Sequence, residues 1–129
     1  MKNRIMDYYH VSSYNHDGET FKPRVPDNTM YGENVTKRRV CFSTSITGCL
    51  NAINVAEYLP YCDDMYYVHV PLGYHGRIVK PTKNDVPDVK YTREKWFVNK
   101  VKMKCIGKIK VHNSSKRGII FKWIEQYDN

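Results

Sequence analysis

Three consecutive hydroxyl residues, Ser43-Thr44-Ser45, stand between a short apolar segment and a stretch with helical periodicity. Backbone N–H groups at the start of a helix lack intrahelical partners, and together with the helix dipole they stabilise phosphates and other anions. The three hydroxyls would join those donors, so the tripeptide predicts an anion-binding site. The same residue types are also the usual caps of a helix N-terminus, and the sequence leaves both interpretations open.

Two further side chains that could do chemistry lie far from this tripeptide in the sequence. His10 ends a tyrosine-rich segment, residues 5–11, that reads as a strand, and an imidazole titrates close to neutral pH. Glu94 opens a late extended segment, where it is flanked by Arg93 and Lys95. If these strands are neighbours in one sheet, the imidazole, the hydroxyls and the carboxylate converge on one cleft. The alternatives are a hydrogen-bonded strand histidine and a surface ion pair.

This order of elements resembles the ADP-ribosyltransferase superfamily, in which a His or Arg, a Ser-Thr-Ser or Tyr element and a late Glu surround NAD. The resemblance covers about residues 8–110. It implies NAD as cofactor, with His10 bound to ribose hydroxyls and Ser43, Thr44 and Ser45 bracing the nicotinamide pocket. It also implies that Glu94 and His10 are the catalytic residues, because a fixed carboxylate stabilises the positive charge that develops on the ribose.

The chain departs from the family pattern at the late strand. Many members that modify proteins carry two carboxylates two residues apart there, whereas this chain has the single Glu94 between cations. A binding-only member of the fold is therefore an alternative.

A separate candidate for anion binding is Arg24, in the segment Phe21-Lys22-Pro23-Arg24-Val25-Pro26. Its two prolines fix an extended backbone, and a guanidinium fork suits a phosphate or a carboxylate. We therefore expect Arg24 to contribute to nucleotide binding. A rigid loop with a solvent-facing arginine is the alternative.

Positive charge is concentrated late in the chain. Residues 77–122 hold 14 basic and 3 acidic residues, whereas residues 1–76 hold 7 and 8. In the extended segment 101–111, apolar residues alternate with Lys102, Lys104, Lys108 and Lys110, which predicts a lysine stripe on one face. Such a stripe favours a polyanionic partner, a nucleic acid, a nucleotide or an acidic protein, although solvated lysines are the plain alternative.

The elements that must position these residues are short. Strands are expected at 5–11, 39–43, 65–70, 78–79, 95–98, 101–111 and 119–125, a helix at 46–59, and a long loop at 14–37. The chain is thus expected to be a single domain over residues 1–129, of the α+β class, with about six strands in small, twisted, mostly antiparallel sheets and one main helix. The resemblance implies that this fold is ADP-ribosyltransferase-like.

Several classes of protein are disfavoured by the composition. No apolar run approaches the length of a membrane span, and Met1-Lys2-Asn3-Arg4 does not lead into a signal region, so we expect a cytoplasmic protein without a membrane partner. The four cysteines and five histidines show no ligand pairing at a zinc spacing. We expect reduced thiols and no metal.

Three functions follow from these expectations. The first is an ADP-ribosyltransferase-like protein that binds NAD or a related nucleotide and transfers ADP-ribose to a protein or nucleic acid. The second is a non-enzymatic anti-defence inhibitor that sequesters a nucleotide signal or docks on a host nucleoprotein, since the chain is similar in size and character to small bacteriophage accessory proteins. The third is a basic nucleic-acid-binding module.

Overall fold

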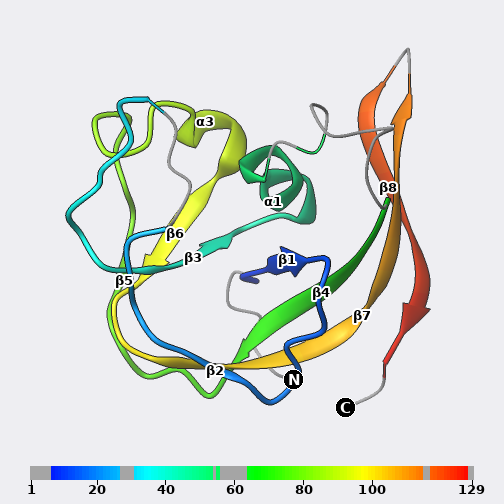
Figure 1. The fold of residues 1–129 in the computed structure, drawn as a ribbon, viewed down its shortest axis with the longest axis horizontal. Coiled ribbons are helices and arrows are strands. Elements are labelled where there is room, and N and C mark those ends of the chain that lie inside the picture. The colour runs from blue at the N-terminus through cyan, green and yellow to red at the C-terminus, as the bar shows by residue number, and fades with distance from the viewer. Residues whose placement is uncertain (1–6, 27–30, 54, 56–63, 115–116, 128–129) are drawn as a thin grey trace, which may run out of the picture.

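Two antiparallel β-sheets and two short helices make up the computed structural model, which describes residues 7–26, 31–53, 55, 64–114 and 117–127 (Figure 1). The elements in chain order are β1 His10–Ser12, β2 Thr20–Phe21, β3 Val40–Ser43, α1 Ile46–Ala52, β4 Met65–Leu72, β5 Ile78–Val79, α3 Val89–Thr92, β6 Glu94–Phe97, β7 Val101–Ser114 and β8 Gly118–Gln126. The larger sheet has the order β1-β4-β7-β2, with β8 paired to β7, and the smaller sheet has the order β3-β6-β5. The predicted antiparallel α+β architecture is confirmed at this level.

The helix α1 begins where the hydroxyl residues predict it. Ser45 is its N-cap, and the Ser45 hydroxyl accepts a hydrogen bond of 2.9 Å from the Gly48 N–H. Ile46, Cys49 and Leu50 form its buried face, at the spacing of one side of a helix. The helix ends at Ala52 and Ile53 is its C-cap, whereas most of the predicted continuation to residue 59 lies outside the described residues.

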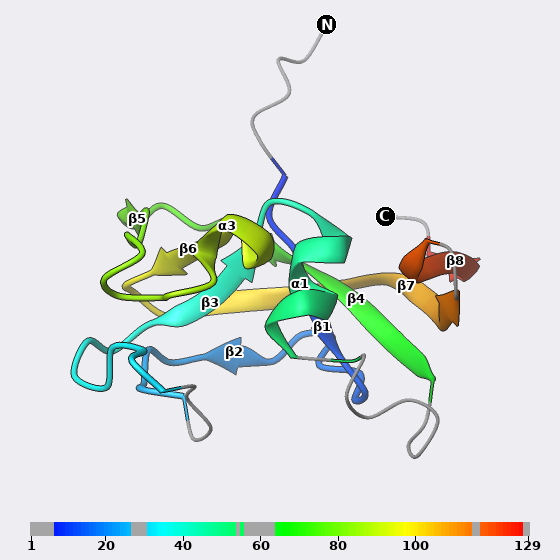
Figure 2. The same cartoon turned by 90° about the horizontal axis from the view of Figure 1, so that it is seen from above.

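Two hydrophobic clusters form the interior. The first lies between α1 and the larger sheet and includes Leu50, Val68 and Ile109. The second lies between the smaller sheet and the beginning of β7, and includes Phe42, Phe97, Val101 and Met103. Seen from above, β7 runs past the smaller sheet and reaches β8 at the far end of the molecule (Figure 2). One strand therefore contributes to both clusters.

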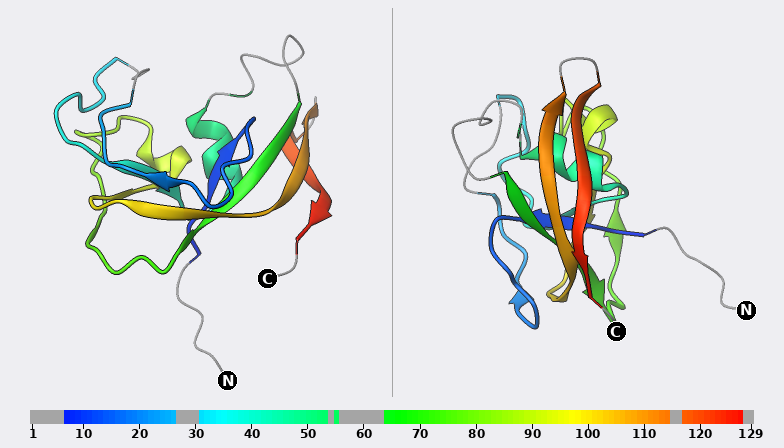
Figure 3. Two further views of the ribbon diagram at one scale, coloured as in Figure 1. Left: turned by 60° about the horizontal axis from the view of Figure 1, so that its bottom comes forward. Right: turned by 90° about the vertical axis from the view of Figure 1, so that its right-hand side faces the viewer.

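A β-bulge allows β7 to do this. Val68 of β4 pairs with Gly107, but the next residue, His69, pairs with Cys105, so Ile106 is extra. Adjacent residues on β4 point to opposite faces, and the bulge therefore moves the buried residues of β7 from one face of the ladder to the other. Beyond the bulge β7 bends and pairs with β8, so residues 107–110 lie between β4 and β8, and residues 111–114 pair with β8 (Figure 3).

The structure also corrects some of the predicted elements. The described part contains eight strands rather than about six, and β2 lies inside the predicted loop 14–37. The four-residue helix α3 was not predicted, because Pro87 and Asp88 precede it and read as a turn. The first strand begins at His10 rather than near residue 5, and residues 1–6 lie outside the described residues.

Gly107 tests the importance of the bulge. Its φ of +156° is rarely adopted by other residues, and an added Cβ would meet the Glu125 carbonyl and the Trp123 ring. We expect Gly107→Ala to lower the free energy of unfolding by about 1–3 kcal/mol in urea denaturation. Gly73→Ala is the matched control, since Gly73 has a φ of +66° but open space around it. An equal loss in both variants would contradict the role of close packing at the bulge.

Candidate functional site

The hydroxyls of the Ser-Thr-Ser tripeptide are largely engaged within the protein. Ser43 donates a hydrogen bond of 2.6 Å from Oγ to the Thr92 carbonyl, and the same oxygen accepts one of 3.2 Å from the Ser45 N–H. Ser45 caps α1, while the Thr44 N–H lies 3.4 Å from the Arg93 carbonyl that accepts its hydrogen bond. Of the two open interpretations, the structure shows the capping role. The helix α1 has only seven residues, so its N-terminus does not by itself make an anion-binding site.

His10 is brought next to this tripeptide by a β-bridge between Tyr9 and Ser43. Its imidazole is packed among rings rather than exposed in a cleft: its centroid lies 5.3 Å from that of Phe21 and 6.2 Å from that of Phe42. Burial, followed by the neighbouring His69, lowers the pKa of His10 to about 4. The imidazole is therefore neutral at physiological pH.

Glu94 is also close to the tripeptide, since it pairs with Ser43 in the β3–β6 ladder. Its carboxylate is buried, accepts a hydrogen bond of 2.6 Å from the Trp96 indole N–H and lies 3.5 Å from the Cys41 thiol that donates to it. Burial is the main cause that raises the pKa of Glu94. This carboxylate anchors a tryptophan in the interior.

His10 and Glu94 lie on opposite faces of the smaller sheet. Cys41 contacts Glu94, whereas the next residue on β3, Phe42, contacts His10. Because successive strand residues point to opposite faces, the expected convergence of imidazole and carboxylate does not occur. The spacing in the sequence could not reveal this, since a shift of one residue in either strand would exchange the faces.

The buried side chain of Arg39 lies on the same face of the smaller sheet as Glu94. Its guanidinium lies 4.3 Å from the centre of the Trp96 ring, forms an ion pair of 2.9 Å with Glu33, and donates to the carbonyls of Asn34 and Lys37. Arg24, the predicted nucleotide ligand, forms a β-bridge with Arg39 through two backbone hydrogen bonds. Its segment therefore runs along the edge of β3, with the Arg24 side chain exposed.

The structure contains a cluster of three histidines at β1 that the sequence did not predict. The His10, His16 and His69 ring centroids lie 5.4–6.2 Å apart. The His16 backbone N–H donates to His69 Nε2 at 2.9 Å, and His69 Nδ1 lies 3.2 Å from the His10 carbonyl. A backbone N–H only donates and a carbonyl only accepts, so His69 is the neutral tautomer protonated on Nδ1. The signal was weak, because the three positions are scattered over 60 residues.

This cluster makes stability depend on pH. The pKa of His10 is about 4 in the folded chain, against an ordinary value of 6.5, and burial lowers the pKa of His69 as well. Between pH 4 and pH 6.5 the unfolded chain binds more protons than the folded chain. The free energy of unfolding therefore has its full value above about pH 6.5 and decreases as the pH falls toward 4, by about 3 kcal/mol for His10. Urea denaturation at pH 4.5–7.5 measures this loss.

His10→Gln should flatten the pH profile, whereas the exposed His112→Gln should leave it unchanged. A wild-type profile that stays level from pH 7 to pH 4.5 would contradict the lowered pKa values of His10 and His69.

The bulge divides the predicted lysine stripe into two pairs. Lys108 and Lys110 pair with Tyr67 and Met65 of β4, whereas Lys104 and Lys102 pair with Val70 and Leu72. Residues 65 and 67 point to one face of β4, and residues 70 and 72 point to the other. The expectation of a single stripe is therefore wrong. The reason is the extra residue Ile106, which regular alternation in the sequence conceals.

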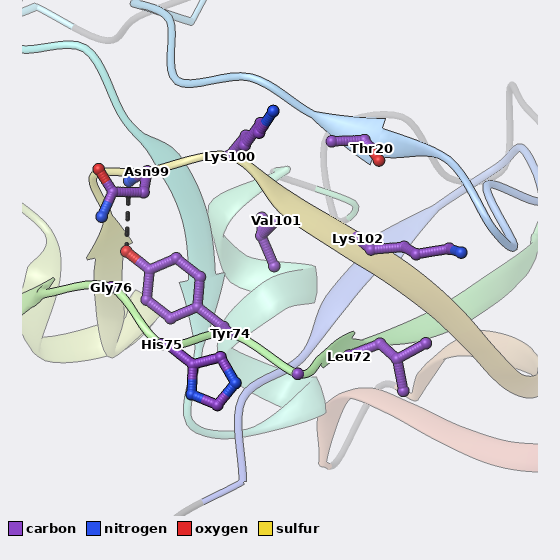
Figure 4. A pocket seen from close by; sticks show the side chains of 10 residues that line it. Thr20, Leu72, Tyr74, His75, Gly76, Asn99, Lys100, Val101 and Lys102 are labelled. Atoms are coloured by element: carbon purple, nitrogen blue, oxygen red, sulfur yellow. Dashed lines mark hydrogen bonds between the residues drawn. The ribbon is translucent and has the colours of Figure 1, made fainter.

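One lysine of the second pair, Lys102, borders a groove between the β4–β5 and β6–β7 connections (Figure 4). The groove measures about 290 Å³ and is lined by Thr20, Leu72, Gly73, Tyr74, His75, Gly76, Asn99, Lys100, Val101 and Lys102. No carboxylate is among these described residues. Of the site residues predicted from the sequence, only Lys102 lines it.

Tyr74 fixes the shape of this groove. Its hydroxyl donates to the Arg77 carbonyl at 2.6 Å and accepts from the N–H groups of Val98 and Asn99 at 3.1 and 3.2 Å. Its ring packs on Phe97 at 4.3 Å between centroids. Gly76 lies so close to Tyr74 and Asn99 that a side chain there would displace them. Both walls are thus held before any ligand binds.

Comparison with known proteins finds no matching family model, curated protein or solved structure. Within the described ranges, no group of three His, Cys, Asp or Glu side chains is placed to hold a metal ion. No helix among the described residues has the length and apolar character of a membrane span.

Proposed function

We propose that the protein is a non-enzymatic binder of a small phosphate-bearing ligand, of the size of a nucleotide, which it holds in the groove beside Tyr74. The observation that carries this proposal is the set of groups that line the groove. Two ammonium groups, an amide, two hydroxyls and an imidazole line it, and no carboxylate among the described lining residues repels an anion. Its volume of about 290 Å³ is at the small end of ligand sites in proteins.

The residues of the groove provide different contacts for the ligand. Lys102 stands between Thr20 of β2 and Leu72 of β4 in the sheet register, so its ammonium group lies beside a hydroxyl and an apolar side chain. Lys100 and Asn99 extend the donors along the β6–β7 connection. The rigid wall at Tyr74 lowers the entropy that binding must overcome, because few groups need ordering.

ADP-ribosyl transfer, the finer proposal that the family resemblance implies, has less support from this geometry. It needs His10 and Glu94 at one pocket, but the two side chains lie on opposite faces of the smaller sheet. Glu94 is also buried against Trp96, where a substrate has no access. The binder proposed above keeps NAD or a related nucleotide as a ligand and omits the transfer step.

Calorimetric titration with ATP, NAD and ADP-ribose tests the proposal. We expect at least one of the three to bind, and Lys102→Gln to weaken that binding about tenfold, because a charge-assisted hydrogen bond is lost. Lys122→Gln on β8 is the matched control, since it removes an exposed strand lysine away from the groove. NAD incubated with the protein should remain intact.

Equal binding by Lys102→Gln and the wild type would remove the groove as the site. Steady consumption of NAD by the wild type would instead favour the transferase.

A second candidate function, nucleic-acid binding, is favoured by the ribbon of β7 and β8. Lys110 stands between Met65 of β4 and Lys122 of β8 in the register, and Lys108 lies with its Nζ 5.4 Å from the Tyr67 ring centre. Three lysines and a tyrosine thus share one face of the sheet. Cations with an aromatic ring are the usual means of holding a single strand.

This second function predicts binding that falls steeply with salt. In a gel shift with a random single-stranded oligonucleotide, we expect Lys108→Gln/Lys110→Gln to lose binding and Lys102→Gln/Lys104→Gln to keep most of it, because the bulge places the two pairs on opposite faces. Equal losses in both double variants would contradict a single binding face.

A further inference from the structure

Two lysines are forced together at the end of the smaller sheet. Lys95 on β6 pairs with Phe42 of β3, and on its other side β5 pairs Val79 with Trp96. Continuing that antiparallel register by one residue places Lys80 alongside Lys95. Like charges directly opposite each other destabilise a sheet, so this arrangement carries a cost.

The electrostatics of Lys95 reflect this crowding. Lys95 is partly buried, and its pKa is lowered first by burial and then by the charges of Lys80 and Arg93. The described ion pairs are His16–Glu19, Lys37–Asp85 and Arg39–Glu33, and none involves these three cations. Glu94 is adjacent in sequence, but its carboxylate is buried on the other face with Trp96 and Cys41.

The backbone at Arg93 is a second, independent observation. Among the described residues other than glycine, Arg93 alone has a positive φ, with φ 53° and ψ 39°. It ends α3 in the left-handed conformation, a position at which glycine is the usual residue. Its carbonyl accepts a hydrogen bond from the Thr44 N–H, which fixes the turn next to β3. An arginine kept at a strained position points to a use for its side chain.

Lys95 lies at the border between the hydrophobic interior and solvent. Phe97, two residues along β6, shares its face and packs edge-on against the Tyr8 ring at 5.2 Å between centroids. The Phe97 ring is buried, whereas Lys80 and Arg93 are exposed and Lys95 is partly exposed, so a ligand approaches the three cations from solvent.

We propose that Lys80, Arg93 and Lys95 form a binding site for a phosphoryl group, separate from the groove beside Tyr74. A guanidinium binds two phosphate oxygens at once, and two ammonium groups neutralise the remaining charge. Binding also removes the repulsion between Lys80 and Lys95, so the anion stabilises the end of the sheet. The phosphoryl group comes either from a free phosphate compound or from a nucleotide.

Titration with inorganic pyrophosphate, followed by NMR of the lysine side chains, tests this site. We expect pyrophosphate to raise the pKa of Lys95 and to raise the melting temperature of the wild type. Lys95→Gln should weaken pyrophosphate binding about tenfold, and it should fold normally because it relieves repulsion. Lys83→Gln, which removes an exposed lysine three residues from Lys80, is the control and should bind like the wild type.

Arg93→Gly separates a structural role from a binding role. Glycine adopts the left-handed conformation without strain, so this variant should be at least as stable as the wild type and yet bind pyrophosphate about tenfold less tightly. Unchanged binding in Lys95→Gln or in Arg93→Gly would overturn the proposal, as would an equal loss in Lys83→Gln.

Two further measurements identify the ligand and test whether this site is independent of the groove. ADP that binds more tightly than pyrophosphate identifies a nucleotide as the source of the phosphoryl group, whereas equal affinity identifies the free anion. Lys102→Gln should bind pyrophosphate at Lys95 like the wild type. The groove and this site can therefore fail separately.

Discussion

The bulge between β4 and β7 is the constraint on which the rest of the molecule depends. One extra residue, Ile106, exchanges the two faces of β7 and lets a single strand supply Ile109 to one hydrophobic cluster and Met103 to the other. Without this extra residue, a regular strand would place lysine side chains in one of the two hydrophobic clusters and apolar side chains in solvent. The placement of the basic residues on two different surfaces follows from the same single insertion.

The residues that most resemble catalytic groups prove to be structural for a related reason. The face of the smaller sheet that carries Glu94 also carries Trp96 and the buried Arg39. A buried guanidinium needs both an ion pair and carbonyl acceptors, and the segment before β3 supplies Glu33, Asn34 and Lys37 for it. The carboxylate, the indole and the guanidinium thus complete one closed network. Residue type alone does not distinguish such a network from an active site.

The elements themselves were largely predictable from the sequence, whereas the site was not. Alternation in 101–111 predicted β7, and Ser45 with the apolar spacing after it predicted the start of α1, because these signals are local. The two-residue β2 lacks such a signal, since Thr20 and Phe21 form a strand only through pairing with β7. The faces of His10 and Glu94 depend on register, and the groove depends on two distant connections meeting at Tyr74. Neither leaves a pattern within one segment.

A strand shared by both clusters also has a consequence for how the molecule comes apart. Val101 and Met103 lie in one cluster and Ile109 and Val111 in the other, on the same continuous backbone of β7. If the packing in either cluster is lost, the other half of β7 is destabilised as well, so neither half is an independent folding unit. We therefore expect the described part of the chain to unfold cooperatively, and fragments that divide β7 to lose their structure.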